Sequence, residues 1–385
     1  MKNKVIVFKE YMLHTSERFV LDQAQNIKNF DVTLMGLNKL KYIPFDDMKV
    51  VCLDAFSKLQ IILYKLLGFS PKLVSLIKNE NPDILHIHMG GDAARFTAIR
   101  NKFNIPVIAT FHGTDATTSD YWKKKSNLIY HRQYPGKRQN IIKDIDHFIA
   151  VSEYVKKAMI KQGYPEKKIT VNYMGIDIDF FSKSNIQVKR EKIVVFVGRL
   201  VKIKGCEYLI QAMSHVKKVV PDSKLVIIGD GQEASSLKEL SNKNNVNAEF
   251  LGVQKKEIIK EYLQKASVFC CPSITMDSGG AEGLGIVFLE AQAMGVPVVS
   301  FLSGGIPEAV LNNKTGFLYS EKDIIGLYTG IITLLTNNIL WKEFSINCKK
   351  HINLNFDIKK QTLLLEDIYK QLISDYKKIP YEKNP

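Results

Sequence analysis

Residues 282–290 read Glu-Gly-Leu-Gly-Ile-Val-Phe-Leu-Glu, a glycine-rich turn that runs directly into an apolar helical segment. Gly283 and Gly285 lack a Cβ atom, so the backbone of the turn can approach a ligand closely. The helix predicted from 286 to 294 would point its first N–H groups out of the turn, and this end of a helix favours a phosphate. Glu290 then lies about 7 Å along the helix axis, which is roughly the step from a diphosphate to a ribose.

Two apolar runs flank this turn and place it at the edge of a sheet. Residues 266–273 precede it and residues 296–301 follow it, and both have the length and composition of buried strands. The turn therefore lies at the C-terminal end of a predicted parallel strand, where open α/β sheets bind ligands. Glu282 precedes the helix and is expected to reach the other way, towards the group that a bound diphosphate carries.

Short apolar runs alternate with helical patterns along the whole chain, which predicts two α/β domains with parallel sheets. The length of 385 residues suits two domains, and the polar stretch 181–192 is interpreted as the linker between them. We expect two Rossmann-like domains that face a cleft, at 1–185 and 192–360, with a helix at about 362–385 packing back on the first. The other strands are expected at 5–8, 32–36, 84–88, 107–111, 147–151, 169–172, 193–198, 224–229, 248–252 and 315–319.

Composition narrows the class of protein. No stretch offers about 18 uninterrupted apolar residues, so no transmembrane helix is expected. The five cysteines show no metal-ligand spacing, and Cys270 and Cys271 are expected to be packing residues in a protein of the reducing cytoplasm. No zinc spacing, RNA-reading aromatic strand or arginine-rich tract is present, so no nucleic-acid partner is expected.

The net charge of +15 is concentrated in the first half of the chain. Residues 1–190 hold 30 basic and 18 acidic side chains, a net +12, against 24 and 21 in residues 191–385, a net +3. A basic domain suits an anionic partner, although simple solubility explains it equally well. Aromatic residues interleave with lysine and arginine across 121–138, a combination that suits a membrane interface.

Charged and histidine side chains follow other predicted strands. Arg199 and Lys204 come after the strand at 193–198, where two cations can neutralise a diphosphate leaving group, although such residues in a loop are commonly just solvated. His112 ends another strand beside a glycine and can meet a ligand or simply cap the strand. His86 and His88 share one face of a strand, and we expect buried, hydrogen-bonded rings there rather than a metal site.

Two further glycine-rich turns follow strands of the second half. Gly229-Asp230-Gly231 resembles the start of a dinucleotide fingerprint but lacks its third glycine and its paired acidic residue, so a tight strand-to-helix turn explains it as well. Gly304 and Gly305 follow the strand at 296–301, so their loop is expected beside the turn at 283–285.

Together these motifs resemble glycosyltransferase family 4. The resemblance covers nearly the whole chain and is most specific in the second half. In that half the resemblance rests on the motifs Gly-Arg-Leu…Lys-Gly at 198–205, Gly-Asp-Gly at 229–231, Phe-Leu-Gly at 250–252, Glu-x7-Glu at 282–290 and Gly-Gly-Ile-Pro-Glu at 304–308. In the first half, Ser16-Glu17-Arg18-Phe19-Val20, the paired histidines and His112-Gly113-Thr114-Asp115 look similar to members that assemble bacterial exopolysaccharide or O-antigen, including colanic-acid and amylovoran enzymes.

The resemblance implies the two-domain fold called GT-B and a retaining sugar transfer without a metal or cofactor. It assigns His112 and Glu282 to the reacting sugar and Glu290 and Gln254 to the ribose and base. The donor diphosphate would be held by Arg199 and Lys204 with the amides of Gly283, Leu284, Gly285 and Ile286. Acceptor or sugar contacts would come from Ser16, Glu17, Asp115, Gly304 and Gly305. The loop at 9–16 departs from the family because it lacks glycines, so no phosphate contact is assigned to it.

The expected function is therefore an enzyme, a hexosyltransferase-type glycosyltransferase of cell-surface polysaccharide synthesis. The donor is expected to be a UDP-sugar, with GDP-mannose as the main competitor, and the acceptor a polyprenyl-diphosphate-linked glycan. The basic first half and the missing transmembrane helix suggest a cytoplasmic protein bound peripherally to the anionic inner face of the plasma membrane. Two alternatives stay open: a sugar-nucleotide epimerase of similar fold, and a nucleotide-binding partner without turnover.

Overall fold

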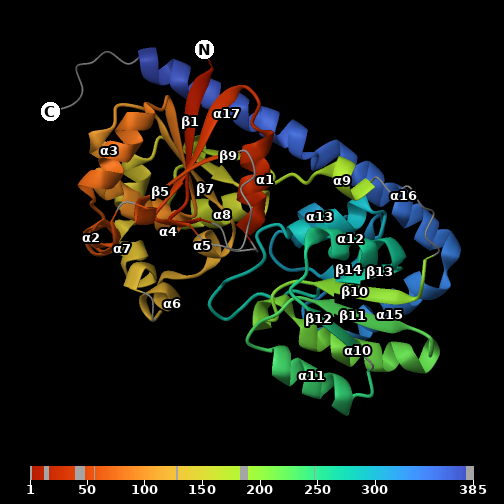
Figure 1. The fold of residues 1–385 in the computed structure, drawn as a ribbon. Coiled ribbons are helices and arrows are strands. Elements are labelled where there is room, and N and C mark those ends of the chain that lie inside the picture. Colours follow the sequence, from red (N-terminus) through yellow and green to blue (C-terminus); the bar gives the residue numbers. More distant parts are fainter. Residues whose placement is uncertain are drawn as a thin grey trace. The chain divides into compact units, whose positions relative to one another are not determined.

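The computed structural model describes residues 2–12, 17–39, 48–55, 57–126, 129–182, 190–246 and 248–378. The chain divides into two compact units, residues 1–175 with 358–385 (unit 1) and residues 176–357 (unit 2), and Figure 1 shows the elements of each. The division thus falls before the stretch interpreted as a linker, and the helix α9 (Ile178–Ser182) already belongs to unit 2. Most of that stretch, 183–189, lies outside the described residues.

Unit 1 is built on a parallel sheet whose described strands have the order β5-β3-β1-β6-β7-β8-β9. Central strands such as β6 and β7 are buried along their whole length, which is why they read as continuous apolar runs in the sequence. The strands are β1 (Asn3–Phe8), β3 (Phe30–Gly36), β5 (Lys49–Cys52), β6 (Ile84–His88), β7 (Val107–Phe111), β8 (His147–Ala150) and β9 (Ile169–Val171), with β2 (Tyr11–Met12) paired to β4 (Asn38–Lys39) beside them.

The last helix of the chain, α17 (Ile358–Lys378), is part of unit 1. Its Leu365, Tyr369 and Ile373 are buried in one apolar core with side chains of α1 (Arg18–Asn26) and of the sheet. Glu366 adds polar contacts, since its carboxylate accepts hydrogen bonds from the backbone N–H groups of Lys28 and Asn29 at 2.6 and 2.8 Å. The C-terminal segment therefore completes the core of the first unit.

Serine caps and glycine ends explain several helix limits in unit 1. Ser70 accepts a hydrogen bond from Leu73 N–H at 3.1 Å and Pro71 occupies the first turn, so α3 begins there. Gly68 ends α2 with a φ of 72°, which glycine adopts without strain. The helices are α2 (Lys58–Leu67), α3 (Pro71–Glu80), α4 (Gly90–Phe96), α5 (Thr114–Thr117), α6 (Asp120–Lys124), α7 (Ile129–Asp144) and α8 (Glu153–Lys161), with short 3₁₀ turns at η2 (Leu53–Ala55), η3 (Thr97–Lys102) and η4 (Glu166–Lys168).

Unit 2 repeats the plan with a parallel sheet in the order β12-β11-β10-β13-β14-β15. Its strands are β10 (Ile193–Val197), β11 (Lys224–Ile228), β12 (Ala248–Gly252), β13 (Val268–Cys270), β14 (Val298–Phe301) and β15 (Gly316–Tyr319). Its other helices are η5 (Lys202–Lys204), α10 (Cys206–Val219), α11 (Ala234–Lys243), α12 (Lys256–Lys265), α13 (Ile286–Ala293), α14 (Ile306–Ala309), α15 (Ile324–Thr336) and α16 (Asn338–Asn355). The two parallel-sheet α/β domains predicted from the sequence are confirmed.

Two strands of unit 2 are shorter than predicted. The expected strand 266–273 is paired only over Val268–Cys270, because Pro272 has no N–H group to donate to a neighbour. The strand expected at 296–301 begins at Val298, after Pro297. The consequence is a long loop, 271–285, between β13 and α13, and this loop carries Glu282.

The described helices were compared with the length and apolar composition that a membrane-spanning helix needs. No single helix among them has the length and apolar composition to cross a bilayer, whereas two bent pairs, α2 with α3 and α15 with α16, meet those two criteria together.

Candidate functional site

An ion pair joins the two loops of unit 2 that the sequence singles out. Lys204 lies at the end of η5, after β10, and its Nζ donates to the Glu282 carboxylate in the loop after β13. Both side chains are mostly buried, with exposed fractions of 16% and 15%. The loops are also joined through their backbones, since Ile274 N–H donates to Ile203 C=O at 2.9 Å. Two of the predicted site residues therefore meet at the C-terminal edge of neighbouring strands.

The charge of Lys204 is maintained despite its burial. Burial alone would lower the pKa of Lys204, but the Glu282 carboxylate outweighs this and raises that pKa above its ordinary value. Arg199 lies in the same loop with an exposed side chain, and its positive charge acts on Lys204 from nearby. The edge of the sheet thus presents one paired cation and one exposed cation.

The second glycine-rich loop packs on the backbone of Glu282. Gly305 N–H donates to Glu282 C=O at 2.8 Å, and a Cβ atom on Gly304 would lie 2.2 Å from the same oxygen. Gly304 also has a φ of 56°. The two loops are neighbours, as expected, and the contact itself shows that both glycines help to position Glu282; their predicted sugar contact stays a prediction.

The turn before α13 takes the conformation that glycine permits. Gly285 has a φ of 83° at the N-cap of α13, and a side chain there would collide with the ring of Phe288. Ile286 begins the helix, and Glu290 lies one turn later with a half-buried side chain. Gly283 and Leu284 are buried, so only their backbone groups can serve a ligand.

Gln254 lies beyond β12, in the loop that precedes α12. Its side-chain amide donates to Leu251 C=O at 2.5 Å, which fixes the side chain across the end of the strand. A base contact by this residue is left to its carbonyl oxygen, its second amide N–H or its backbone.

The glycines at 229 and 231 have a packing function. A Cβ atom on Gly229 would lie 1.9 Å from Gly198 C=O, and one on Gly231 would lie 2.4 Å from Leu200 C=O. The loop after β11 is therefore pressed against the loop after β10, which carries Arg199. This close contact supports the strand-to-helix turn rather than a dinucleotide fingerprint.

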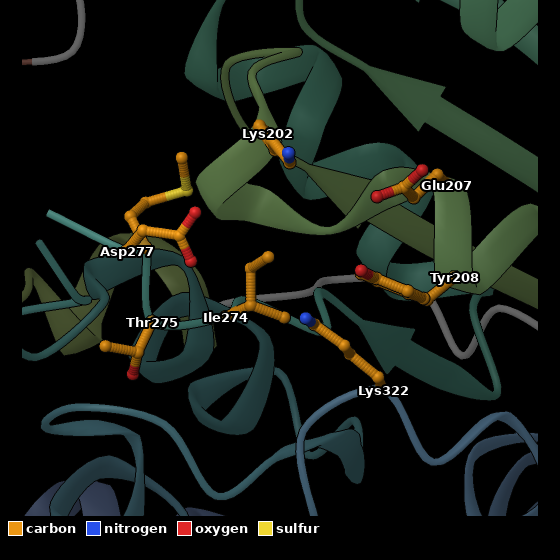
Figure 2. Close-up of a pocket in the computed structure, with 8 residues that line it drawn as sticks. Lys202, Glu207, Tyr208, Ile274, Thr275, Asp277 and Lys322 are labelled. Carbon is orange, nitrogen blue, oxygen red and sulfur yellow. The ribbon is translucent and has the colours of Figure 1, made fainter. Parts of the chain in front are cut away.

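A polar cavity of about 270 Å³ is lined by residues of η5, of the start of α10 and of the loop after β13, together with Lys322. Figure 2 shows Lys202, Glu207 and Tyr208 on one side of it and Asp277 and Lys322 around Ile274. Its wall is held in place by Glu321, which accepts hydrogen bonds from the backbone N–H of Thr275 at 2.8 Å and from its hydroxyl at 2.6 Å. None of the site residues predicted from the sequence lines this cavity.

In unit 1 three histidines form one stack, in which His86 and His88 are buried and His112 is half-buried. His88 Nδ1 and His112 Nε2 are 3.0 Å apart in a hydrogen bond, and the rings of His86 and His88 stack with centroids 4.3 Å apart. His86 is bonded through both ring nitrogens, Nδ1 to Tyr369 Oη at 2.5 Å and Nε2 to Thr110 Oγ1 at 2.6 Å. The expected hydrogen-bonded histidine rings are confirmed, and His86 has no nitrogen left for a metal.

Burial keeps these histidines neutral. It lowers the pKa of His86 to about 3 with help from His112, and the pKa of His112 to about 3 with help from Lys9. Burial also lowers the pKa of His88 well below its ordinary value. All three rings are therefore uncharged at neutral pH, and His112 acts as a hydrogen-bonding group there rather than as a cation.

Acid should therefore destabilise the protein as pH falls below about 6.5, where an unfolded histidine gains a proton. A pKa lowered by folding contributes stability above that pH and loses it towards the folded value, about 2 kcal/mol at pH 5 for His86 alone. Urea unfolding of the full chain at pH 7.5 and pH 5 measures this loss. His86→Gln removes one titration and should reduce the decline; an unfolding midpoint that does not change with pH would contradict the assignment.

Asp115 and Glu17, two further predicted residues of unit 1, make contacts within that unit. The Asp115 carboxylate accepts hydrogen bonds from four backbone N–H groups, those of Gly90, His112, Gly113 and Ala116. Asp115 therefore positions the backbone of His112. Its predicted acceptor or sugar contact stays a prediction. Glu17 pairs with Lys9 at 3.6 Å, and Ser16 lies outside the described residues.

A buried charge cluster after β1 was missed by the sequence reading. Arg95 binds the Glu10 carboxylate through two nitrogens, and Asp92 lies 3.4 Å from Lys9 and 3.8 Å from Arg95. Burial and Asp92 raise the pKa of Glu10 above its ordinary value, while Arg95 lowers it. The signal was available in Lys9-Glu10, two charges directly after an apolar strand, where a loop of the sheet's C-terminal edge begins.

The aromatic and basic segment 121–138 is only partly exposed. Tyr121 and Trp122 are exposed, but Lys123 is buried with its Nζ 4.2 Å from the ring centroid of Tyr134. Arg138 is paired with Asp120. Much of the segment thus stabilises α6 against α7 rather than facing solvent.

Comparison with known proteins agrees with these motifs. Residues 52–180 match the family model described as "Glycosyltransferase Family 4", and residues 177–351 match the one described as "Glycosyl transferases group 1". The chain is 26% identical over 365 residues to the N-acetyl-alpha-D-glucosaminyl L-malate synthase of Bacillus anthracis, covering 91% of this chain and 86% of that one. It is 28% identical to the amylovoran biosynthesis glycosyltransferase AmsK of Erwinia amylovora, covering 66% of this chain and 61% of that one.

Solved structures show the same fold. The structure of Alr3699/HepE of Anabaena in complex with UDP and glucose has a TM-score of 0.78 at 17% identity, covering 96% of this chain and all of that one. With the paired motifs of unit 2 in place at one sheet edge, the chain belongs to glycosyltransferase family 4 and has the GT-B fold of that family.

Proposed function

We propose that this glycosyltransferase is a retaining enzyme that moves a sugar from a UDP-sugar to a polyprenyl-diphosphate-linked glycan in cell-surface polysaccharide synthesis. The proposal needs neither a metal nor a cofactor. One observation carries it: the Lys204–Glu282 pair at the start of α13, with Arg199 beside it.

The chemistry of the leaving group explains why these cations suit the reaction. Departure of a nucleoside diphosphate builds negative charge on a phosphate oxygen, and fixed cations with a helix N-terminus stabilise that charge. In the ligand-free protein Glu282 neutralises Lys204. A bound diphosphate would compete for Lys204, and the released Glu282 carboxylate would then accept hydrogen bonds from hydroxyl groups of the donor sugar.

UDP is supported as the nucleotide by the neighbours of this fold. The HepE structure holds UDP and glucose, although relatives of this chain include GDP-mannose-dependent mannosyltransferases. Thermal-shift measurements with UDP, GDP and their sugars test the assignment. A selective rise in melting temperature with UDP compounds is expected; a selective response to GDP compounds would replace the donor, and no response to any of them would overturn the proposed function.

The alternative functions are less favoured. The matched family models and the named relatives are glycosyltransferases, whereas neither an epimerase nor a non-catalytic partner is among those named here. An epimerase would convert UDP-N-acetylglucosamine in the absence of any acceptor. Sugar transfer that requires a glycan acceptor distinguishes the proposed activity from it.

A polyprenyl-linked acceptor would lie in a membrane, so we also propose that the enzyme binds a membrane surface. The helix α2 supports this. Ile61 and Tyr64 bury one side of this helix, while Leu59, Ile62 and Leu66 are exposed on the other, with exposed fractions of 63%, 53% and 66%. Exposed lysines at 58 and 65 adjoin this apolar face. An amphipathic helix with an exposed apolar face and basic residues suits the surface of an anionic membrane, where a lipid-linked acceptor and the cytoplasmic enzyme would meet.

Replacing Leu59 and Leu66 with glutamate should weaken binding to vesicles of anionic lipid at least tenfold at low salt, because it removes buried apolar area and adds repulsion. Co-sedimentation with anionic and neutral vesicles measures this. Leu354→Glu is the matched control, since Leu354 is an exposed leucine of unit 2. Equal binding of the wild-type protein to both vesicle types would refute the membrane assignment.

A further inference from the structure

We propose that His88 is a positioning residue whose hydrogen bond couples the tautomer of His112 to its own, so that the bonded pair determines whether His112 offers a donor or an acceptor to the substrate. The proposal rests on the proposed function, in which His112 serves the reacting sugar. It assigns a role to a histidine that the sequence reading treated only as part of the fold.

The parallel pairing of β6 and β7 brings the rings together. His88 lies opposite Thr110 in the register of the two strands, and His112 follows Thr110 by two residues, directly after the end of β7. Successive side chains of a strand alternate between faces, so His86, His88, Thr110 and His112 all share one face. This arrangement makes the 3.0 Å contact between His88 Nδ1 and His112 Nε2 a direct consequence of the sheet.

A single hydrogen bond between two neutral imidazoles couples their tautomers. If His88 Nδ1–H donates, His112 Nε2 accepts and the proton of His112 lies on Nδ1. If His112 Nε2–H donates, His88 Nδ1 accepts and the proton of His88 lies on Nε2. The two rings must therefore carry their protons on the same nitrogen, both on Nδ1 or both on Nε2.

The same bond leaves Nδ1 of His112 for a ligand. In the first arrangement this atom is a donor, suited to an oxygen that gains negative charge, and in the second it is an acceptor, suited to a sugar hydroxyl. The ring cannot turn to exchange its nitrogens freely, because Phe19 packs on it at 5.0 Å between centroids and Asp115 holds its backbone N–H. The tautomer of His112 therefore cannot change unless that of His88 changes with it.

The stack is anchored at its far end by the C-terminal helix. Tyr369 of α17 and Thr110 occupy both nitrogens of His86, whose ring stacks on His88. Both partners are hydroxyls that can donate or accept: if Tyr369 donates to Nδ1, Nε2–H donates to Thr110, and if Nδ1–H donates to Tyr369, Thr110 donates to Nε2. The three rings form a continuous support from α17 to His112.

Long-range ¹H–¹⁵N correlation spectra of the full chain, labelled in histidine, test the coupling directly. His88 and His112 are expected to be neutral, with protons on the same ring position. Protons on different positions, or a charged ring at pH 7, would overturn the proposal. This readout does not need turnover, so it stays decisive even if no nucleotide sugar is transferred and the proposed function fails.

Variants of His88 connect the tautomer to activity. His88→Leu should lower kcat on the order of 10–100-fold, as loss of an orienting partner does at other sites, with nucleoside diphosphate affinity changed less than about twofold. His88→Asn can still bond His112 from the position of Nδ1 and should recover most of kcat. Equal kcat for the leucine variant and wild type, or no recovery with asparagine, would contradict the assignment.

His147 offers the matched control for these substitutions. It lies on β8, beside β7 in the same sheet, and its Nε2 bonds Thr170 Oγ1 at 2.9 Å outside the stack. His147→Leu and His147→Asn should leave both kcat and the His112 tautomer unchanged. A fall in kcat for these variants equal to that of the His88 variants would show a general effect of altering the sheet and would refute a specific role for His88.

Discussion

Replacing Glu282 with glutamine is expected to lower kcat by about 10²–10³-fold while nucleoside diphosphate affinity changes by less than about threefold. The substitution keeps the size of the side chain but removes the charge that neutralises Lys204 in the free protein. Lys204 stays available to the diphosphate, so binding of the nucleotide is preserved. The sugar loses a carboxylate partner, so turnover falls. Steady-state kinetics and calorimetry on the same preparations separate the two effects.

A substitution of Glu290 should have the opposite effect, on nucleotide binding rather than on turnover, and therefore tests the roles assigned to the two glutamates. Glu290→Gln should weaken nucleotide binding by about tenfold, the effect of one lost charge-assisted hydrogen bond, because this side chain is assigned to the ribose. Glu239→Gln is the neutral control, since Glu239 is exposed on α11. If Glu282 governed nucleotide affinity and Glu290 governed turnover, the two assignments would have to be exchanged.

Replacing Lys204 with methionine is expected to raise the dissociation constant for UDP or GDP by about 10–100-fold and to destabilise the free protein by about 1–3 kcal/mol. Affinity falls because a charge-assisted contact to the diphosphate is lost. Stability falls because the mostly buried Glu282 carboxylate loses its cation. Calorimetry with nucleotide and urea unfolding measure the two quantities.

The double variant Lys204→Met with Glu282→Gln separates the structural effect from the functional one. It removes the unpaired carboxylate, so most of the lost stability should return while affinity and kcat stay low. Lys204→Arg keeps the charge and should bind nucleotide more tightly than the methionine variant. Recovery of turnover in the double variant would show that the ion pair serves the fold alone.

Much of the fold was predictable because the signals are local. β6 and β7 begin and end where the apolar runs predict. The Lys204–Glu282 meeting could be anticipated because the carboxyl ends of neighbouring parallel strands share one edge. Strand ends at Pro272 and Pro297 were misjudged because an apolar run does not show which of its N–H groups find a partner.

Other features depend on contacts between distant segments. The Asp115 carboxylate accepts hydrogen bonds from four backbone N–H groups, and one of them belongs to Gly90 at the start of α4, a partner that the sequence around Asp115 does not show. The bond between His88 and His112 joins separate strands and becomes apparent only from their register. The sequence does not show that one apolar side of α2 is exposed, because a leucine or isoleucine in a helix can be buried in the core or lie on the surface.

The sequence by itself determined the family, the alternation of strands and helices, and the residue types at the C-terminal edge of the sheet of unit 2, because each is encoded in short-range spacing. The tertiary structure alone decided which charges are paired, which histidine nitrogens are occupied and which glycines hold Glu282. These depend on the strand order and register that bring residues such as Lys204 and Glu282, or Tyr369 and His86, within hydrogen-bond distance. At those contacts the Glu282 carboxylate keeps Lys204 charged despite its burial, and burial keeps the histidines neutral, and the expected chemistry rests on both.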